Sequence, residues 1–212
     1  MKIELQHISK RFDEQVILHD INQVFEYASI SAILGANGAG KSTLLQIIAG
    51  QMSPSKGKVL YQHNAVNIEA DKLYTHLSYC APYLELIEEM TLLEFLAYHF
   101  SFKKALIPIE DMMKYIGLEA AKNKMIEKFS SGMKQRVKLA QAIFSDTSLL
   151  ILDEPCSNLD VKGISLFEQM IHEFKRDRTI IIASNDPQEY ACCEQFIQLD
   201  NLNHHKPSHV ER

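Results

Sequence analysis

The segment Gly35-Ala-Asn-Gly-Ala-Gly-Lys-Ser-Thr43 decides the fold class of this chain, because it matches the pattern G-x-x-x-x-G-K-[ST] in the right context. Residues 29–34 before it form an apolar run that predicts a strand, and Leu44, Leu45 and Ile48 after it have helical spacing. Glycines let backbone N–H groups turn inward around phosphate oxygens, and the start of a helix adds partial positive charge. The alternative is a glycine-rich turn that carries Lys-Ser-Thr by chance; the flanking strand and helix favour nucleotide phosphate binding.

Individual roles follow from this phosphate-binding loop. Lys41 is expected to neutralise the β- and γ-phosphates of the nucleotide, and the Ser42 hydroxyl is expected to hold Mg²⁺. The predicted nucleotide-binding residues of the loop are Gly35, Asn37, Gly38, Ala39, Gly40, Lys41, Ser42 and Thr43.

A second acidic site follows the apolar run Leu149-Leu-Ile-Leu152. Asp153 ends this predicted strand, and a carboxylate at the carboxyl end of a parallel strand reaches the crevice where such sheets bind ligands. We therefore expect Asp153 to act on Mg²⁺. Glu154, one residue further, is predicted to polarise the attacking water as general base. In isolation, two acids before Pro155 are also a common strand end, but beside the phosphate-binding loop a metal and catalytic site is favoured.

Composition limits the kind of protein that carries these motifs. The chain has 212 residues, a formal net charge of −5, 46% hydrophobic residues and 23% charged residues. These values fit one soluble globular domain, and the acidic balance argues against nucleic acid as the main partner. No apolar stretch approaches the roughly 18 residues of a membrane span, and the N-terminus lacks the apolar block of a signal peptide. The chain is therefore expected in the cytoplasm.

Cysteine and histidine usage gives little further chemistry. The four cysteines, Cys80, Cys156, Cys192 and Cys193, have no C-x-x-C spacing and are predicted to be reduced thiols. Residues 203–209 contain three histidines, for which a frayed polar terminus is favoured over an adventitious metal site.

The order of apolar patterns predicts the architecture. Strands are expected at residues 2–8, 16–26, 29–34, 58–62, 76–81, 149–152, 179–184 and 195–199. Between residues 83 and 145 the apolar spacing is helical, starting at the capping-box pattern of Thr91 and Glu94. Helices are also expected from Lys41 to Gly50 and over residues 161–176. The pattern predicts an α/β core with a helical lobe inserted between two core strands.

The segment Phe129-Ser-Ser-Gly-Met-Lys-Gln-Arg136 resembles the signature Leu-Ser-Gly-Gly-Gln of the nucleotide-binding domains of ABC ATPases. Ser130 and Gly132 match the serine and the second glycine of that signature. By itself the segment is also a Ser-capped amphipathic helix with a basic face. Its position shortly upstream of Asp153 and Glu154 is that of the family, and the motifs follow the family's order over the whole chain.

The resemblance implies a fold and further site residues. The fold is an α/β P-loop NTPase core with an antiparallel β-rich N-terminal part and an inserted helical subdomain at about residues 83–145, within one domain of residues 1–212. Phe12 corresponds to the aromatic residue that stacks on adenine, and Ser157-Asn-Leu-Asp160 is similar to the family's D-loop, which adds Asp160 to the nucleotide-binding residues.

The resemblance also implies a mode of action and its partners. Two such domains pack head-to-tail with two ATP molecules between them, as a homodimer or with a paired ATPase subunit. Ser130 and the amides near Gly132 then contact the γ-phosphate from across the interface. The implied function is the ATP-binding and ATP-hydrolysing subunit of an ABC transporter. It would drive a separate polytopic permease from the inner face of the cell membrane, with ATP and Mg²⁺ as cofactors.

Two departures from the family's pattern concern hydrolysis. Pro82 falls where the family usually has a glutamine, and Asn185 falls where it has the switch histidine. Asparagine can donate a hydrogen bond to a phosphate oxygen, but it cannot carry a protonic charge. Asn185 is therefore a candidate catalytic residue beside Glu154 and Lys41, and slower hydrolysis is expected. After it, Asp186, Pro187 and Glu189 predict the capped start of a helix.

Two other functions are also consistent with these motifs. A soluble ATP-driven dimerisation module is one alternative, but its relatives carry two nucleotide-binding domains or a coiled-coil insert, which this chain lacks. A subunit that binds ATP and hydrolyses it weakly is another. Next to the lobe junction, an apolar cluster is equally consistent with packing between lobes and with docking of a permease helix; it consists of Tyr83, Leu84, Leu86 and Ile87.

Overall fold

The computed structural model describes residues 1–199, which form two sheets and the helices that cover them. The antiparallel sheet has the order β2-β1-β4-β5, from strands β1 (Lys2–Phe12), β2 (Gln15–Phe25), β4 (Lys56–His63) and β5 (Val66–Ile68). The parallel sheet has the order β6-β7-β8-β3-β9, from strands β6 (Leu77–Cys80), β7 (Leu149–Asp153), β8 (Thr179–Ala183), β3 (Ile30–Leu34) and β9 (Gln195–Gln198).

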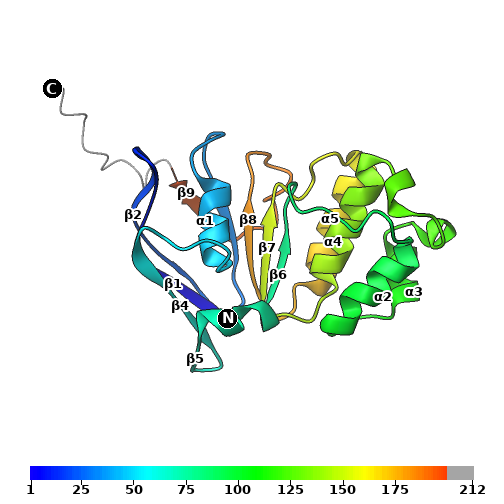
Figure 1. Cartoon of the computed structure of the whole chain (residues 1–212), viewed down its shortest axis with the longest axis horizontal. Coiled ribbons are helices and arrows are strands. Elements are labelled where there is room, and N and C mark those ends of the chain that lie inside the picture. The colour runs from blue at the N-terminus through cyan, green and yellow to red at the C-terminus, as the bar shows by residue number, and fades with distance from the viewer. Residues whose placement is uncertain (200–212) are drawn as a thin grey trace.

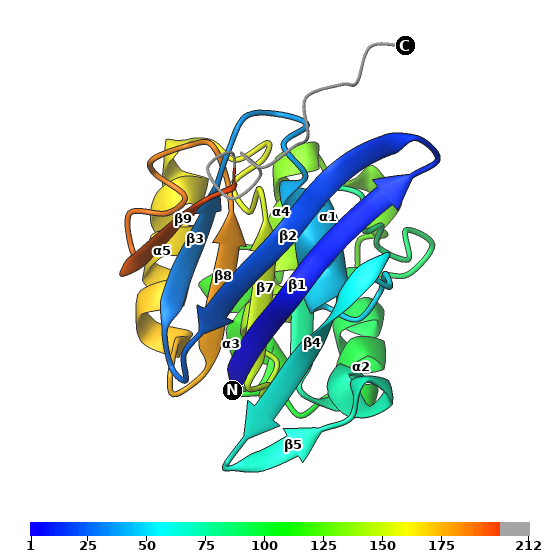
Figure 2. The same ribbon diagram turned by 90° about the vertical axis from the view of Figure 1, so that its left-hand side faces the viewer.

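The helices lie on both faces of the parallel sheet. Helix α1 (Lys41–Ile48) is sandwiched between the two sheets, and α4 (Ser131–Ile143) and α5 (Val161–Phe174) cover the opposite face (Figure 1). Helices α2 (Leu92–Phe102) and α3 (Ile109–Tyr115) lie beyond them, at the end of the molecule farthest from the antiparallel sheet. Short 3-10 turns complete the described chain at Ala70–Thr75, Glu119–Ala121 and Ile126–Lys128. Figure 2 shows β2, β1 and β4 lying across α1.

Alternating side chains of the central strands divide the interior into two cores. Leu149 and Ile151 of β7 pack with α1 and the antiparallel sheet, whereas Leu150 and Leu152 pack with the helices on the other face. A strand that is buried on both faces is apolar at every position, which explains the continuous runs of the sequence. The predicted fold class, an α/β core with an antiparallel N-terminal part and helices between β6 and β7, is confirmed.

Strand β1 is longer than the predicted residues 2–8, and a bulge explains the difference. Its pairing with β4 shifts register between Gln6 and Ser9, and His7 has a left-handed backbone with φ 54°. A bulge interrupts the alternation of side chains, so the pattern in the sequence stops where the strand continues. The extension brings Phe12 to the end of β1, in the hairpin with β2.

The helix predicted after Asp186 is wrong: residues 187–192 form turns. The backbone N–H of Asp186 is bound by the Ser184 hydroxyl at 2.9 Å, so it does not need the Glu189 carboxylate that a capping box would supply. The chain must also return to β3 within a few residues, because β9 pairs with that strand from Gln195. By contrast, the capping box of Thr91 and Glu94 forms at α2 as predicted.

Three further predictions concern the cysteines, membrane-spanning segments and the histidines near the C-terminus. The four cysteines are free thiols, as expected. Among residues 1–199, no helix has the length and apolar character needed to cross a membrane. The histidines of residues 203–209 lie outside the described residues.

Candidate nucleotide-binding site

Lys41 is held inside the loop between β3 and α1. Its side chain is buried, and its Nζ donates hydrogen bonds to the backbone oxygen of Gly35 at 2.6 Å and of Ala36 at 3.3 Å. A third bond, 3.0 Å long, reaches Oδ1 of Asn185. The ammonium is thus fixed at the carboxyl end of β3, at the first residue of α1, where the partial positive charge of the helix acts in the same direction.

Gly40 gives the loop a conformation that other residues do not adopt easily. It caps α1 with φ 100°, and a Cβ atom there would lie 2.9 Å from side-chain atoms of Ile17 and Leu18. The antiparallel sheet therefore closes directly over the loop, and only glycine leaves room for both. No side chain caps the first turn of α1, which leaves its backbone N–H groups available to an anion.

Asp153 ends β7 as a buried carboxylate. Its side chain is 1% exposed, and neither of its oxygens has a hydrogen-bond partner within the described part of the chain. Burial raises the pKa of Asp153, and the Glu154 carboxylate acts in the same direction; the Ser42 hydroxyl, which lies near the carboxylate without forming a hydrogen bond to it, and the Lys41 ammonium lower it. Two unsatisfied oxygens in the interior are costly. They fit Mg²⁺, which prefers oxygen ligands, and Ser42 beside them adds a hydroxyl.

Glu154 leaves β7 in a strained conformation. Its φ is 44°, in the left-handed region, and its N–H donates to the oxygen of Ala183 on β8 at 2.9 Å. This backbone is uncommon for a residue with a side chain, and such strain concentrates at functional sites. The turn directs the exposed Glu154 side chain to the same cavity as the phosphate-binding loop.

A cavity of about 320 Å³ gathers most of the predicted nucleotide-binding residues. It is lined by Phe12, Ile17, Asn37, Gly38, Gly40, Lys41, Ser42, Thr43 and Glu154. Phe12 is 44% exposed at its rim, with Nζ of Lys10 5.0 Å from the ring centre. The exposed aromatic side chain of Phe12, together with the Lys41 ammonium and the uncapped first turn of α1, suits a base joined to phosphates.

Asn185 lies at the edge of this site, between two loop residues. Its Oδ1 accepts from Lys41, and its Nδ2 donates to Oδ1 of Asn37 at 2.6 Å. The end of β8 is thereby joined to the phosphate-binding loop. Pro82 makes no such link: its side chain is exposed, and its carbonyl oxygen accepts from Nζ of Lys138 at 2.9 Å.

Five of the predicted nucleotide-binding residues do not line the cavity: Gly35 and Ala39 of the loop itself, and Ser130, Gly132 and Asp160 from elsewhere in the chain. Ser130 caps α4 and accepts from the N–H of Met133 at 3.3 Å, and its side chain is exposed. Gly132 follows it in the first turn, where a Cβ would lie 3.0 Å from the oxygen of Asn158. Asp160 caps α5 by accepting from the N–H of Gly163 at 2.8 Å. Within one chain, the signature segment is separate from the phosphate-binding loop.

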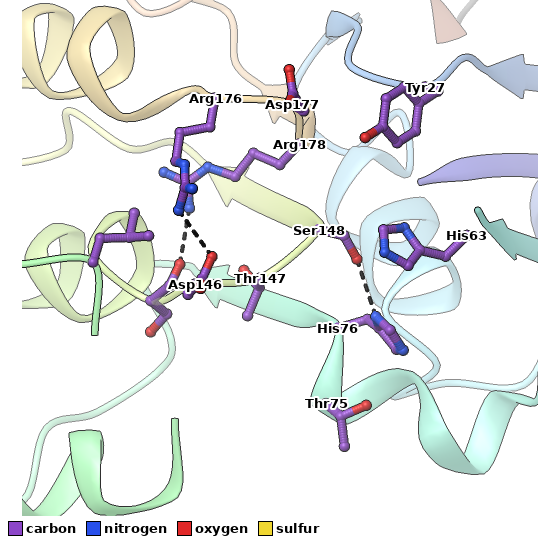
Figure 3. A pocket seen from close by; sticks show the side chains of 12 residues that line it. Tyr27, His63, Thr75, His76, Asp146, Thr147, Ser148, Arg176, Asp177 and Arg178 are labelled. Atoms are coloured by element: carbon purple, nitrogen blue, oxygen red, sulfur yellow. Dashed lines mark hydrogen bonds and ion pairs between the residues drawn. The ribbon is translucent and has the colours of Figure 1, made fainter. Parts of the chain in front are cut away.

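A cavity of about 380 Å³ at the opposite ends of the strands has a structural explanation (Figure 3). Arg178 lies in its wall, where its guanidinium donates to the oxygens of Ile143 at 2.7 Å and Ser145 at 3.1 Å. It thereby satisfies carbonyls at the end of α4. Arg176 forms an ion pair with Asp146 in the same wall. The cations of this cavity are thus engaged within the fold.

Two side chains that hold the Glu154 loop were missed by the sequence reasoning. Nε2 of Gln135 on α4 donates to the oxygen of Pro155 at 2.6 Å, and Oε1 of Glu189 accepts from the N–H of Cys156 at 2.7 Å. Gln135 lies four residues before the buried Leu139 on the same face of α4, so the available sequence signal was a polar residue within the apolar stripe. The sequence misled about Glu189, because its position three residues after Asp186 predicted a capping box and not a contact with a distant loop.

The fold and this loop define a P-loop nucleoside triphosphatase, and comparison with known proteins gives the family. The family model for the ABC transporter matches residues 18–157. The chain is 31% identical over 211 residues to the uncharacterized ABC transporter ATP-binding protein YybJ of Bacillus subtilis, covering 94% of this chain and 93% of that protein. This chain belongs to the ABC transporter family, as an ATP-binding domain.

Two further similarities agree with this assignment. The spermidine/putrescine import ATP-binding protein PotA of Mycoplasma capricolum is 31% identical over 195 residues, which cover 88% of this chain and 55% of PotA. A solved structure of the ATP-binding subunit of an ABC transporter matches with a TM-score of 0.80 at 25% identity, covering 94% of this chain and 87% of that one.

Proposed function

We propose that this chain drives a separate membrane permease by ATP-dependent head-to-tail dimerisation, as a homodimer or with a paired ATPase subunit. One observation carries the proposal: Ser130 and Gly132 stand at the exposed start of α4 and do not line the nucleotide cavity. A second copy, or a similar subunit, supplies the missing hydroxyl and N–H donors to the γ-phosphate. Binding of ATP then closes the dimer, and hydrolysis opens it.

The residues around the cavity take the following roles in this proposal. Lys41 and the N–H groups of α1 bind the β- and γ-phosphates, and Phe12 stacks on adenine. Ser42 and Asp153 hold Mg²⁺, which neutralises developing charge on the phosphates. Glu154 accepts a proton from the attacking water, and Asn185 contacts the γ-phosphate side of the loop. Asp160 acts from the D-loop at the dimer interface.

The proposed domain organisation is one ABC ATPase domain over residues 1–212, with a helical subdomain at about residues 83–145. Helices α2, α3 and α4 are supplied by the chain between β6 and β7, and this supports the insertion. The subdomain carries the signature segment, so its position relative to the core sets where the partner subunit is engaged.

Glu154→Gln tests the dimerisation proposal directly. Removal of the base is expected to lower turnover by about 10²- to 10⁴-fold and to trap a dimer in the presence of ATP and Mg²⁺. Size-exclusion chromatography with light scattering measures the dimer, and phosphate release measures turnover. Adding Ser130→Arg to Glu154→Gln should return the monomer, because a bulky cation then fills the interface, whereas adding the surface change Glu127→Gln should not. Equal dimerisation and turnover in wild type and Glu154→Gln would refute the assignment.

We place the permease contact at Tyr83 and Ile87, beside the junction of the lobes. These side chains are 45% and 39% exposed, which leaves them available to a partner helix, whereas Leu86 is buried and belongs to the packing between lobes. The chain would then be a cytoplasmic protein held peripherally at the membrane. Co-sedimentation with membranes that contain a candidate permease, such as a polytopic membrane protein encoded beside this chain, tests this. Tyr83→Glu and Ile87→Glu should abolish pelleting, and Tyr74→Glu, at another exposed tyrosine, should not.

Weak hydrolysis is the second candidate property, and the contacts of Asn185 favour it. Its amide is engaged by Lys41 and Asn37, and it carries no positive charge toward a γ-phosphate. Pro82 offers no side-chain donor or acceptor at the lobe junction. Turnover equal to that of relatives with glutamine and histidine at these places would contradict this proposal.

A further inference from the structure

Glu189 is a buried carboxylate that reaches the catalytic loop from another segment. Its side chain is 5% exposed and lies in the turns that follow β8. Its Oε1 accepts a hydrogen bond from the backbone N–H of Cys156 over 2.7 Å. Because Cys156 lies two residues after Glu154, this contact ties the segment that begins with Asn185 to the loop that carries the proposed base.

Three consecutive residues of this loop are held from three different elements. The Glu154 N–H is bound by Ala183 at the end of β8, the Pro155 oxygen by Gln135 of α4, and the Cys156 N–H by Glu189. Glu154 itself has φ 44°. A left-handed backbone at a residue other than glycine persists only where the surrounding structure holds it in place. These three hydrogen bonds hold the backbone of residues 154–156, and so they stabilise the conformation of Glu154.

The environment of Glu189 makes a purely packing role costly. Burial raises the pKa of Glu189, and the carboxylates of Asp186 and Glu154 act in the same direction. The Ser184 hydroxyl and the Cys156 N–H oppose that effect. An apolar side chain would fill this space without the cost of desolvating a carboxylate, but it would leave the Cys156 N–H without its acceptor.

We propose that Glu189 is a positioning residue for hydrolysis, which holds the Cys156 amide and thereby keeps Glu154 aimed at the nucleotide cavity. Its side chain does not line the nucleotide cavity. Through this bond the Glu154 loop and the Asn185 segment act as one unit, so that a shift of either is transmitted to the other. The inference rests on the proposed role of Glu154 as general base.

The first test separates turnover from nucleotide binding in the full-length protein. Glu189→Ala is expected to lower kcat by about 10- to 100-fold, because a base displaced by about 1 Å loses that much rate. KM for ATP and the Kd of a fluorescent ATP analogue should change less than about twofold, since the contacts of Lys41 are untouched. Glu189→Gln keeps an acceptor oxygen and should stay within about threefold of wild-type kcat. Glu194→Ala, an exposed acid nearby, is the matched control.

The second test asks whether Glu189 acts through Glu154. In a Glu154→Gln background, Glu189→Ala should lower the residual turnover by less than about twofold, because residues that act as a unit are not additive. Should Glu189→Ala fail to fold, Glu189→Asp replaces it, since the shorter side chain keeps the charge but withdraws the acceptor from Cys156.

The outcomes distinguish this inference from the proposed function. The role of Glu189 would be overturned by wild-type kcat in folded Glu189→Ala, or by equal losses of kcat in Glu189→Gln and Glu189→Ala. It would also be overturned if Glu189→Ala lowered kcat by the same factor in the Glu154→Gln background as in the wild type. Undiminished turnover in Glu154→Gln would instead overturn the role of Glu154. A rise in KM that accounts for the whole loss would assign Glu189 to general stability of the nucleotide site and also reject the inference.

Discussion

Nζ of Lys41 donates a hydrogen bond to Oδ1 of Asn185 across 3.0 Å, although 144 positions of sequence separate the two residues. The contact joins the carboxyl ends of β3 and β8, which are neighbours in the parallel sheet. It places Asn185, which we propose stands where the family has its switch histidine, directly on the lysine that we propose binds phosphate. In the proposed site, position 185 therefore faces both the Lys41 ammonium, from which its oxygen accepts, and the place of the γ-phosphate, to which its amide could donate.

Asn185→His should raise turnover. A protonated imidazole forms a charge-assisted hydrogen bond to a phosphate oxygen, which is roughly twice as strong as a neutral one, so we expect kcat to rise by about two- to tenfold. Steady-state phosphate release at saturating ATP and Mg²⁺ measures the change. Asn67→His on the exposed strand β5 is the control and should leave kcat unaltered. Unchanged or lower kcat in Asn185→His would show that the asparagine does not limit hydrolysis.

Asp153→Asn should stabilise the nucleotide-free fold while it abolishes turnover. Burial raises the pKa of Asp153, so between its unfolded and folded pKa values the folded state binds more protons than the unfolded state. The stability of the wild type therefore falls as pH rises through that window and stays lower above it. We expect the amide to raise the free energy of unfolding at about pH 7 by about 1–3 kcal/mol, because it removes a buried unpaired carboxylate.

Urea titrations without nucleotide or Mg²⁺ measure this effect. The gain from Asp153→Asn should shrink as pH is lowered toward the window in which the wild-type carboxyl becomes protonated. Asp177→Asn, at an exposed aspartate, should show no gain at any pH. A lower stability of Asp153→Asn at neutral pH would mean that the carboxylate is satisfied in the free protein, in conflict with its two unpartnered oxygens.

Arg178→Met should destabilise the fold without altering nucleotide affinity. Arg178 donates to carbonyl oxygens of Ile143 and Ser145, and the methionine leaves these oxygens without their donor in a buried place. Hydrogen bonds from a charged group contribute about 1.5–3 kcal/mol each, so we expect a loss of about 3 kcal/mol in the free energy of unfolding. Arg176→Met removes an exposed ion pair with Asp146 and should cost less than about 1 kcal/mol. Equal losses in the two variants would contradict the capping role of Arg178.

The parts of the site that could be predicted are those whose information is local. The glycines, Lys41 and Ser42 lie within one short segment between a strand and a helix, and Asp153 and Glu154 directly end a strand. Glycine is needed for the tight backbone of the loop, and the charged residues are needed beside phosphate and metal; both needs can be recognised from the adjacent strand and helix in the sequence. The two-sided burial of β7 was also readable, because a strand covered on both faces is apolar throughout.

The failures have long-range causes. Glu189 completed a convincing capping box, yet its carboxylate is bound to Cys156, and the expected helix is a series of turns. The predicted first strand ended too early because a bulge at His7 breaks the alternation without ending the pairing. Neither feature depends on nearby residues alone. The distant N–H group of Cys156 binds the Glu189 carboxylate, and the pairing with β4 extends β1 beyond the bulge.

The amino-acid sequence by itself determined the glycine-rich loop before α1, the acids at the end of β7 and the order of most strands and helices, because turns, caps and burial patterns are encoded within a few residues; it did not reveal β5 or the turns after β8. Only the tertiary structure decided that Asn185 contacts Lys41, that Glu189 holds the loop of Glu154 and that Ser130 stands apart from the cavity. The contacts of Asn185 and Glu189 arise where β3, β7 and β8 end side by side, because β8 pairs with β7, 30 residues before it, and with β3, 150 residues before it.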